Sequence, residues 1–445
     1  MNSPPTDLEQ SPERAGIIVP WTLPIDRPSE ERLGESAGLV EALGCELAFL
    51  RPENVRKPTP GYLLSGGLLD RLEADVKTYD CSIVIIDASL TPIQQRNLET
   101  RLGVKVIDRT GLILEIFGLR ARTKEGFLQV ELARLLYERS RLVRTWTHLE
   151  RQRGGQGFLG GPGETQLEAD KRMIDRAIGR LRRDLADVQR TRRVQRQGRQ
   201  RRDTRIVALV GYTNAGKSTL FNRLTGADVM AKDMPFATLD TTIRKLDLPH
   251  LGSVSLVDTV GFISDLPTHL VDSFRATLEE ALEADLLVHV RDRSSAADHE
   301  QKQDVLKVLH QLADLMDADL PPMIEAWNKI DRLDPDTRNG LKAEHACTNE
   351  EMPAVAVSAR TGEGIDGLLA AIEDALDRGR VRLKAHLNNQ DGALRAWLHQ
   401  NTQVENEKFT ESGQVELSVN ITQDEFGRLA ARFPDAAAEQ FERAE

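Results

Sequence analysis

The sequence predicts a multidomain α/β protein of four units, with a doubly wound parallel sheet at its centre. Three features support this prediction. Apolar runs alternate with helical patterns in the first quarter of the chain, two long segments carry narrow apolar seams, and a later region places a glycine-rich loop directly after an apolar run. The predicted units are residues 1–115, 116–203, 204–377 and 378–445.

Residues 1–115 are expected to form an N-terminal α/β domain. Four short apolar runs are typical of buried parallel strands, and they lie at residues 17–19, 45–50, 82–87 and 105–107. Helical patterns lie between them at residues 68–79 and 92–102. This domain has no phosphate-binding loop of its own.

Residues 116–203 carry two apolar seams with alternating spacings of four and three residues, which is typical of a coiled coil. Arg139 is the one charged residue in the first seam. We therefore predict an antiparallel helical hairpin. The seams consist of Leu128, Leu132, Leu135, Arg139, Leu142, Trp146 and Leu149, and of Ile174, Ile178, Leu181, Leu185 and Val188.

The connection between the two helices is rich in glycine. Residues 154–163 hold six glycines and a proline, so we expect that they do not continue a helix. A tip of this kind can mould itself to an RNA surface. The alternative is a flexible linker with no binding role.

The second helix of the hairpin is strongly basic. Residues 171–205 contain fourteen Lys or Arg against four Asp or Glu, whereas the whole chain has a formal net charge of −11. A concentrated arginine excess in an acidic protein indicates contact with the phosphates of a nucleic acid. The alternative is a solvated helix face.

The third unit contains the parts of a guanine-nucleotide site, beginning with a phosphate-binding loop. The apolar run 206–210 precedes the loop. Backbone N–H groups of such a loop surround the β-phosphate, Lys217 can reach the β- and γ-phosphates, and the Ser218 hydroxyl can bind Mg²⁺. The loop consists of Gly211, Tyr212, Thr213, Asn214, Ala215, Gly216, Lys217 and Ser218.

Two further loops would recognise the base. The Asp331 carboxylate can accept hydrogen bonds from N1–H and the N2 amino group of guanine, a pair of donors that adenine lacks. The second loop would contact guanine through backbone N–H groups. The loops consist of Asn328, Lys329, Ile330 and Asp331 after the apolar run 323–327, and of Ser358, Ala359 and Arg360 after the run 354–357.

Two segments between these loops would sense the γ-phosphate. Asp258 would hold Mg²⁺ through a water molecule, and the Gly261 N–H would meet the γ-phosphate. Thr238 is the preferred second Mg²⁺ ligand beside Ser218, with Thr241 and Thr242 as alternatives. The segments consist of Phe236, Ala237, Thr238, Leu239 and Asp240, and of Asp258, Thr259, Val260 and Gly261.

The residue after Gly261 bears on the mechanism. Small GTPases that orient the attacking water with a glutamine carry it at this position, but here it is Phe262. We therefore expect slow intrinsic hydrolysis and a second group that completes the site. Asn214 has two interpretations: its side-chain carbonyl holds K⁺ against the phosphates, or it bonds within its own turn.

The remaining sequence features are less specific. Three widely spaced cysteines fit a reducing cytosol better than a disulfide framework or a zinc site. We expect a cytoplasmic protein, because the N-terminus lacks signal-peptide features and no apolar run approaches the ~18 residues of a membrane span. Residues 378–445 predict a small α+β domain with a strand near 415–421 and a helix at 422–433.

Together these motifs resemble the HflX family of translational GTPases. The combination of the Pro-Gly-Glu-Thr-Gln sequence at 162–166 with this nucleotide-binding core is specific to that family. Many members carry Arg-Gly-Pro-Gly-Glu where this chain has Gly160-Gly161-Pro162-Gly163-Glu164, so no RNA contact of that arginine can be transferred. The matching stretches are residues 108–114, 120–126, 128–132, 161–167, 211–218, 236–240 and 274–280.

The resemblance implies a GTPase that binds the large ribosomal subunit and its RNA as a monomer. Family members are credited with splitting stalled or idle ribosomes under stress while they hydrolyse GTP to GDP and phosphate. The tip of the hairpin would then point at the peptidyl-transferase region. The alternative function is a nucleotide-switched RNA-binding regulator or ribosome-assembly factor.

Overall fold

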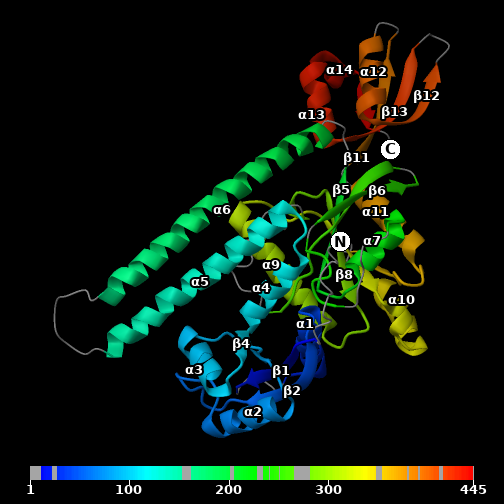
Figure 1. Cartoon of the computed structure of the whole chain (residues 1–445). Coiled ribbons are helices and arrows are strands. Elements are labelled where there is room, and N and C mark those ends of the chain that lie inside the picture. The colour runs from blue at the N-terminus through cyan, green and yellow to red at the C-terminus, as the bar shows by residue number, and fades with distance from the viewer. Residues whose placement is uncertain are drawn as a thin grey trace, which may run out of the picture.

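The computed structural model contains an N-terminal α/β domain, a helical hairpin, a central domain with a mostly parallel sheet and a C-terminal domain (Figure 1). The N-terminal domain and the C-terminal domain lie at opposite ends of the central domain, and the helical hairpin extends to one side. The structure describes residues 12–22, 28–152, 162–200, 205–227, 234–239, 241–249, 251–264, 281–346, 353–377, 380–388, 391–409 and 414–443.

The N-terminal domain is built on a four-stranded parallel sheet in the order β2-β1-β3-β4. All four predicted strands are confirmed. The Ile- and Val-rich runs of β1, β3 and β4 are buried, whereas β2 lies at the edge of the sheet and buries mainly Phe49. The strands are β1 (Arg14–Trp21), β2 (Glu46–Asn54), β3 (Ile83–Ile86) and β4 (Lys105–Asp108).

Helices cover both faces of this sheet. The helices α2 (Gly66–Thr78) and α3 (Pro92–Leu102), both expected from the sequence, pack on one face. The helices α1 (Glu30–Ala42) and α4 (Arg109–Arg120) pack on the other, and the sequence pattern had revealed neither. Helix α4 continues through residue 115, where we had placed the end of the domain.

The helical hairpin consists of α5 (Lys124–Gln152) and α6 (Pro162–Gln200), which lie side by side (Figure 1). Their buried contacts follow the predicted seams, with Leu128, Leu132, Ile178 and Leu185 at the centre. The charged break in the first seam is accommodated at the surface, where Arg139 Nε lies 2.7 Å from the Asp175 carboxylate.

The structure corrects one boundary of the hairpin. Helix α6 begins at Pro162, inside the segment 154–163 that we expected to be non-helical. Proline and glycine are tolerated in the first turn because the N–H groups there have no partner in the helix. The rest of the glycine-rich tip, residues 153–161, lies outside the described residues, as do the predicted family stretch 274–280 and Asp240.

The central domain has a six-stranded sheet in the order β10-β9-β8-β5-β7-β6, parallel except for β6. Helices lie on both faces, as a doubly wound fold requires. The strands are β5 (Ile206–Gly211), β6 (Thr242–Leu248), β7 (Gly252–Asp258), β8 (Leu286–Asp292), β9 (Met323–Asn328) and β10 (Ala354–Ala356). The helices are α7 (Lys217–Thr225), α9 (Asp298–Met316), the short 3₁₀ helix Ile330–Arg332, α10 (Pro335–Ala346) and α11 (Ile365–Asp377).

The C-terminal domain is an antiparallel sheet in the order β12-β13-β11-β14, with helices packed against it. The predicted strand and helix are confirmed as β13 (Val415–Thr422) and α13 (Gln423–Arg432). The other elements are β11 (Arg380–Leu387), α12 (Gly392–Asn401), β12 (Gln403–Phe409), α14 (Pro434–Glu439) and β14 (Phe441–Arg443). Among the described helices of the whole chain, none is long and apolar enough to cross a membrane.

Candidate nucleotide site

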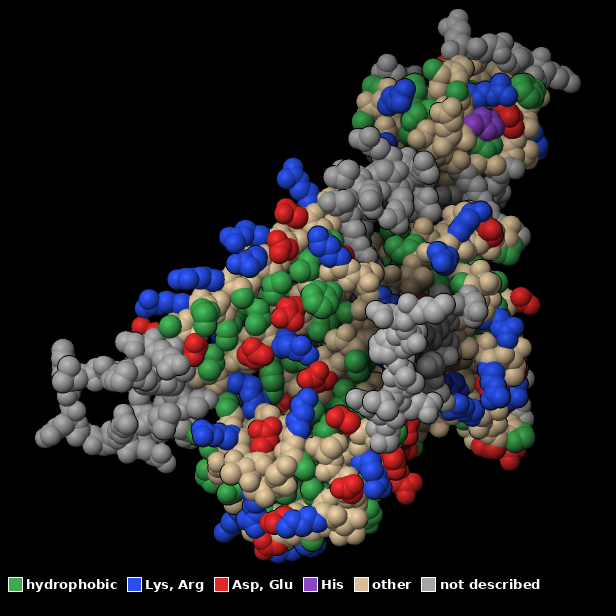
Figure 2. All heavy atoms as spheres, in the orientation of Figure 1, with side chains coloured by type: hydrophobic (Ala, Val, Ile, Leu, Met, Phe, Trp, Pro, Cys, Tyr) green, Lys and Arg blue, Asp and Glu red, His purple; other side chains and the backbone are tan. Residues whose placement is uncertain are grey.

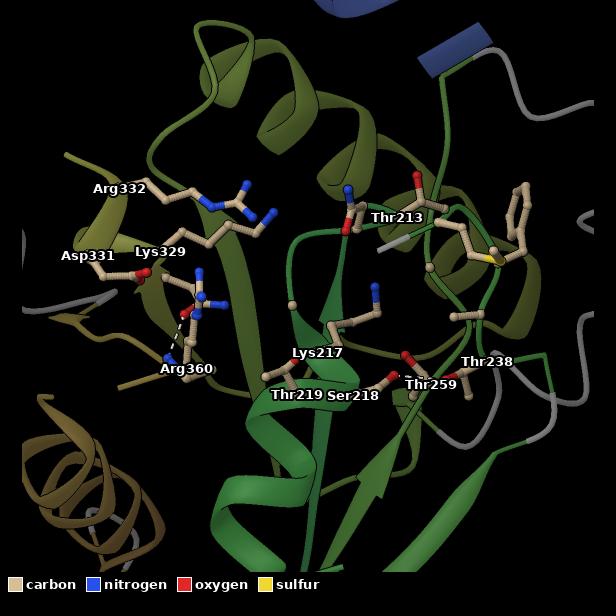
Figure 3. Close-up of a pocket in the computed structure, with 18 residues that line it drawn as sticks. Thr213, Lys217, Ser218, Thr219, Thr238, Thr259, Lys329, Asp331, Arg332 and Arg360 are labelled. Carbon is tan, nitrogen blue, oxygen red and sulfur yellow. Dashed lines mark hydrogen bonds between the residues drawn. The ribbon is translucent and has the colours of Figure 1, made fainter. Parts of the chain in front are cut away.

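A cavity of about 400 Å³ opens at the carboxyl end of the central sheet, where the phosphate-binding loop begins (Figure 3). Carboxyl ends of parallel strands are where ligands bind in folds of this kind. Fifteen of the residues predicted for the site line this cavity: Thr213, Asn214, Gly216, Lys217, Ser218, Phe236, Ala237, Thr238, Thr259, Gly261, Asn328, Lys329, Asp331, Ala359 and Arg360.

The phosphate-binding loop connects β5 to α7 through a left-handed residue. Gly216 has φ +96°, and a Cβ there would lie 2.3 Å from Nδ2 of Asn328, so only glycine fits. Lys217 is buried, and its Nζ donates to the carbonyl oxygens of Gly211 at 3.0 Å and Tyr212 at 2.7 Å. The backbone N–H groups at the start of α7 therefore face the cavity beside a buried cation, which suits phosphate.

The electrostatics of Lys217 favour an anion beside it. Burial lowers the pKa of Lys217 to about 8, and the nearby Asp258 carboxylate offsets this only in part. Burial also raises the pKa of Asp258 above its ordinary value. The hydrogen bond from Ser218 and the charge of Lys217 lower this pKa, but burial outweighs them. Both groups would gain from a bound phosphate and a cation.

Three oxygens converge beside Lys217. The Ser218 hydroxyl donates to Oδ2 of Asp258 at 2.7 Å, and Thr238 Oγ1 lies 2.8 Å from Ser218 Oγ and 3.2 Å from the same carboxylate oxygen. Neighbouring ligands of an octahedral Mg²⁺ lie ~3 Å apart, which is the spacing of the Ser218 and Thr238 hydroxyls. The other Asp258 oxygen, Oδ1, is buried without a hydrogen-bond partner among the described residues. This set of oxygens therefore fits Mg²⁺.

The structure favours Thr238 over the two alternative threonines. Thr241 Oγ1 is buried without a partner in the part of the chain that the structure describes, and Thr242 begins β6. Neither residue lines the cavity.

At the other end of the cavity, Asn328 connects the loops. Its amide donates to the Ala215 carbonyl oxygen at 2.8 Å, and its Oδ1 accepts from the Ala359 N–H at 3.0 Å. The Ser358 hydroxyl donates to Asp331 Oδ1 at 2.7 Å, which orients that carboxylate. Phosphate loop and base loops thus form one connected frame.

The segment after β7 runs along the phosphate-binding loop. Phe262 N–H donates to the Gly211 carbonyl at 3.1 Å, and Thr213 N–H donates to the Phe262 carbonyl at 2.6 Å. A Cβ on Gly261 would lie 3.0 Å from Lys217 Nζ, so Gly261 is held beside the lysine. The Phe262 side chain is only 2% exposed and packs in the core, so it contributes no polar group to the cavity.

Some predicted residues do not line the cavity. Tyr212, Ala215, Leu239, Val260 and Ile330 are buried in the hydrophobic cores. Gly211, Asp258 and Ser358 lie directly behind lining residues, to which they are bonded.

Other residues at the cavity were missed from the sequence. Thr219, Met234 and Arg332 line it, and Asp292 Oδ2 lies 2.8 Å from Lys329 Nζ. Thr219 and Arg332 directly follow the predicted residues Ser218 and Asp331, so each could have been found by extending its motif by one residue. No local pattern marks Met234 or Asp292.

Asn214 lies in the left-handed region, with φ +59°, and its side chain is exposed. Its carboxamide makes no hydrogen bond to any residue that the structure describes. The turn is closed by the backbone, with the Ala215 N–H donating to the Tyr212 carbonyl at 3.3 Å.

Four family models match the chain. They are described as GTP-binding GTPase N-terminal over residues 30–118, GTP-binding GTPase Middle Region over 120–199, 50S ribosome-binding GTPase over 206–329, and HflX C-terminal domain over 343–442.

Curated relatives match over almost the whole chain. A protein of Magnetococcus marinus named GTPase HflX is 44% identical over 428 residues, which cover 95% of this chain and 96% of the relative. The GTPase HflX of Escherichia coli is 43% identical over 404 residues, which cover 91% and 93%. Among solved structures, the complex of SsGBP with GDP has a TM-score of 0.47 and 25% identity, covering 82% of this chain and 99% of that one.

Proposed function

Because the chain belongs to the HflX family of GTPases, we propose that it binds the large ribosomal subunit and dissociates stalled or idle ribosomes. The chain is a P-loop GTP hydrolase of a ribosome-binding family, and its reaction converts GTP and water to GDP and phosphate. The dissociation of ribosomes is our proposal, in addition to this family assignment. In this proposal the protein works as a monomer in the cytoplasm during stress.

The observation that carries the proposal is the basic hairpin joined to the GTPase domain. Figure 2 shows Lys and Arg side chains along the outer edge of α6. Among the side chains of this helix that the structure describes, six arginines are exposed, and they are Arg172, Arg176, Arg180, Arg182, Arg183 and Arg190. A projecting arm with this charge suits insertion between RNA phosphates, and insertion near a subunit interface would separate the subunits.

We assign roles in the nucleotide site from its geometry. Asp331 and the loop at Ser358 would recognise guanine, and Lys217 would contact the β- and γ-phosphates. Ser218 and Thr238 would hold Mg²⁺ directly, and Asp258 would hold it through water. When bound, Mg²⁺ neutralises phosphate charge during transfer.

The hydrolysis step needs a group that this cavity does not supply. Water attacks the γ-phosphorus, the bond from that phosphorus to the bridging oxygen breaks, and GDP leaves. Phe262 is unable to orient this water, so we propose that ribosomal RNA or protein completes the site. The exposed carboxamide of Asn214 would hold K⁺ against the phosphates.

GTP turnover by the purified protein, with and without large ribosomal subunits, tests the proposal. We expect strong stimulation by the subunits in potassium buffer and weaker turnover in sodium buffer. Equal turnover in both buffers would remove the potassium assignment. Sedimentation of intact ribosomes after addition of protein and GTP should show separated subunits.

A hairpin variant sharpens the experiment. Replacing Arg176, Arg180 and Arg183 with Gln should abolish ribosome dissociation and stimulated turnover but leave basal turnover unchanged, because these residues lie outside the cavity. The control replaces three arginines of the N-terminal domain with Gln, namely Arg14 on β1, Arg51 on β2 and Arg71 on α2. It removes the same number of positive charges from outside the hairpin. GTP binding without any subunit stimulation would instead favour the RNA-binding regulator.

A further inference from the structure

The N-terminal domain contacts the segment that carries Thr238. The Phe117 ring of α4 meets the Phe236 ring edge to face, with centroids 4.6 Å apart. On α1, Gly38 approaches Pro235 so closely that a Cβ there would lie 3.2 Å from the proline ring. Residues two and three positions before Thr238 are thus packed directly against α1 and α4.

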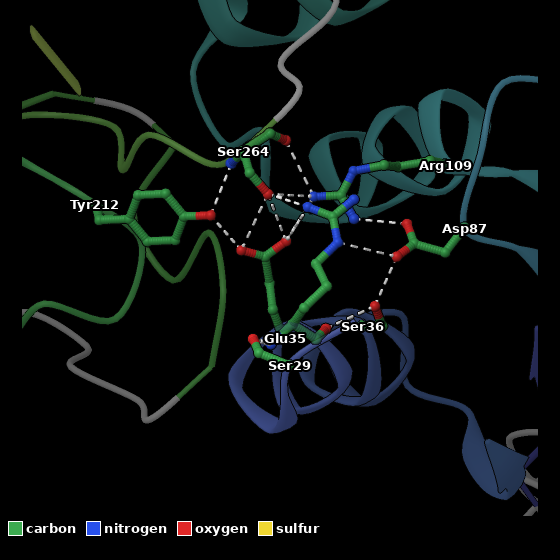
Figure 4. Close-up of polar contacts among 8 residues, drawn as sticks. Ser29, Glu35, Ser36, Asp87, Arg109, Tyr212 and Ser264 are labelled. Atoms are coloured by element: carbon green, nitrogen blue, oxygen red, sulfur yellow. Dashed lines mark hydrogen bonds and ion pairs between the residues drawn. The ribbon is translucent and has the colours of Figure 1, made fainter. Parts of the chain in front are cut away.

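The same face of the N-terminal domain also holds the segment that carries Gly261. Figure 4 shows Glu35 of α1 at the centre of a polar cluster formed by Tyr212, Ser264 and Arg109. The Glu35 carboxylate accepts from the Tyr212 hydroxyl, from the Ser264 hydroxyl at 3.1 Å and from Arg109 at 2.5 Å.

Ser264 is fixed at every polar atom. Its N–H donates to the Tyr212 hydroxyl at 2.7 Å, its carbonyl oxygen accepts from Arg109 at 3.0 Å, and its hydroxyl bonds to Glu35. Three residues earlier, Gly261 lies beside Lys217. The short segment 261–264 is therefore held at one end by the phosphate-binding loop and at the other by the N-terminal domain.

The cluster is largely buried, and its charges are balanced, because Arg32 and Arg109 both face the carboxylates of Glu35 and Asp87. Arg109 also pairs with Asp87 at 2.6 Å, and Asp87 accepts from the Ser36 hydroxyl at 2.7 Å. Burial raises the pKa of Tyr212, and the adjacent Glu35 carboxylate adds to this, so the hydroxyl keeps its proton as a donor. Such a network has one well-defined arrangement, because removing a partner leaves a buried group unpaired.

The cluster coexists with the closed arrangement of the Mg²⁺ ligands. Thr238 lies at the Ser218 and Asp258 oxygens in the same structure in which Ser264 is held. Thr238 reaches these oxygens because its segment is folded against the phosphate-binding loop, and the contacts of Pro235 and Phe236 with the N-terminal domain support that arrangement.

We propose that Glu35 and the Tyr212 hydroxyl are positioning residues that hold Ser264, and through it Gly261, where the Gly261 N–H meets the γ-phosphate. The preference of the protein for GTP over GDP then depends on its N-terminal domain. Linkage requires the converse, that GTP binding strengthens the contact between the two domains. This inference rests on the guanine-nucleotide site of the proposed function, but not on ribosome dissociation.

The test compares two nucleotides in three full-length variants. Tyr212→Phe removes one hydroxyl and keeps the ring in the core, and Glu35→Gln removes the charge that accepts it. Tyr137→Phe is the matched control, since it removes another largely buried tyrosine hydroxyl, which donates at 2.7 Å to Asp108, the residue that caps α4. Affinities for GDP and for a non-hydrolysable GTP analogue are measured with Mg²⁺ and K⁺ present.

We expect the affinity for the GTP analogue to fall about tenfold (~1.4 kcal/mol) in Tyr212→Phe and Glu35→Gln. The affinity for GDP should change less than twofold, and Tyr137→Phe should match wild type for both nucleotides. The double variant should lose little more than either single variant, since both residues act through Ser264.

Two results would overturn the inference. One is an unchanged affinity of Tyr212→Phe for the analogue, and the other is an equal loss of both nucleotides, which indicates a purely structural role. Failure of wild-type protein to bind either nucleotide would refute the nucleotide site itself, whereas intact discrimination without ribosome dissociation would refute only the proposed function.

Discussion

Two clusters of buried charge in the GTPase domain differ in how fully their members are paired. In the first, Lys217 and Asp258 at the nucleotide cavity have pKa values shifted toward their neutral forms by burial. In the second, on β8, β9 and α9, Arg291 bonds to Asp298 and to Glu325 at 2.5 Å, and Lys302 lies 2.7 Å from Glu325.

In the second cluster, each of these charged groups has an oppositely charged partner. Burial alone would raise the pKa of Glu325, but Lys302, the Trp327 indole and Arg291 outweigh it and bring the pKa to about 2. Buried charges whose pKa values are shifted toward the neutral form are typical of ligand-binding sites, whereas charges that their partners hold ionised are typical of structural networks. The first cluster should therefore govern nucleotide binding and the second should govern stability.

The largest expected effect comes from breaking the second cluster. Glu325→Gln leaves Arg291 and Lys302 without their shared carboxylate, and we expect the free energy of unfolding to fall by ~3–5 kcal/mol. Urea denaturation measures this change. Glu168→Gln is the control, because its ion pair with Arg172 is about two-thirds exposed and should contribute less than ~1 kcal/mol. Similar losses in both variants would refute the distinction.

A substitution in the first cluster should act on binding. Lys217→Met keeps most of the side-chain volume but removes the cation, and we expect affinity for GDP and GTP to fall about 100-fold, since charge-assisted hydrogen bonds contribute ~1.5–3 kcal/mol each. Its stability without nucleotide should match or exceed that of wild type. Calorimetric titration and urea denaturation give the two readouts.

Lys302→Met serves as the matched control for that variant. It should lower the free energy of unfolding, because Glu325 loses a partner at 2.7 Å, and it should leave nucleotide affinity unchanged. If Lys302→Met weakened nucleotide binding as much as Lys217→Met, the two clusters would not be separable.

The smallest effect is a pH dependence of stability. The pKa of Lys217 is about 8 in the folded protein and 10.5 as its ordinary value. Between these pH values the unfolded chain binds more protons at this residue, so stability without nucleotide should rise with pH, on the order of 1–3 kcal/mol. Denaturation of wild type against Lys217→Met isolates this contribution. A difference between the two proteins that stayed constant from pH 7.5 to 10.5 would contradict it.

Local sequence patterns were sufficient to predict an element wherever the residues that define it lie within one short segment. The strands at 17–19 and 206–210 are continuous apolar runs, and the hairpin seam is a regular spacing along one chain. The phosphate-binding loop and its base loops are short motifs whose chemistry depends on a few adjacent residues. Each of these could be predicted because the information lies within about ten to thirty residues.

Helix α1 shows why other parts could not be predicted. Its sequence contains Gly34 and Gly38, which weaken a helical pattern, but Gly38 lets the helix lie close to Pro235. Helix α4 is buried on most sides and lacks a clear polar face. Both helices are stabilised by packing against the N-terminal sheet and against each other rather than by a helical pattern in their own sequences.

The sequence by itself determined the four-unit plan, the guanine-nucleotide motifs and the charged hairpin, since each depends on residues that are close along the chain. Only the tertiary structure decided that Thr238 rather than Thr241 or Thr242 meets Ser218 and Asp258. It also brought Glu35 to Tyr212 and Ser264, across separations of 177 and 229 residues. Such contacts follow from how the domains pack on one another, and packing depends on the shape of whole surfaces rather than on any local pattern.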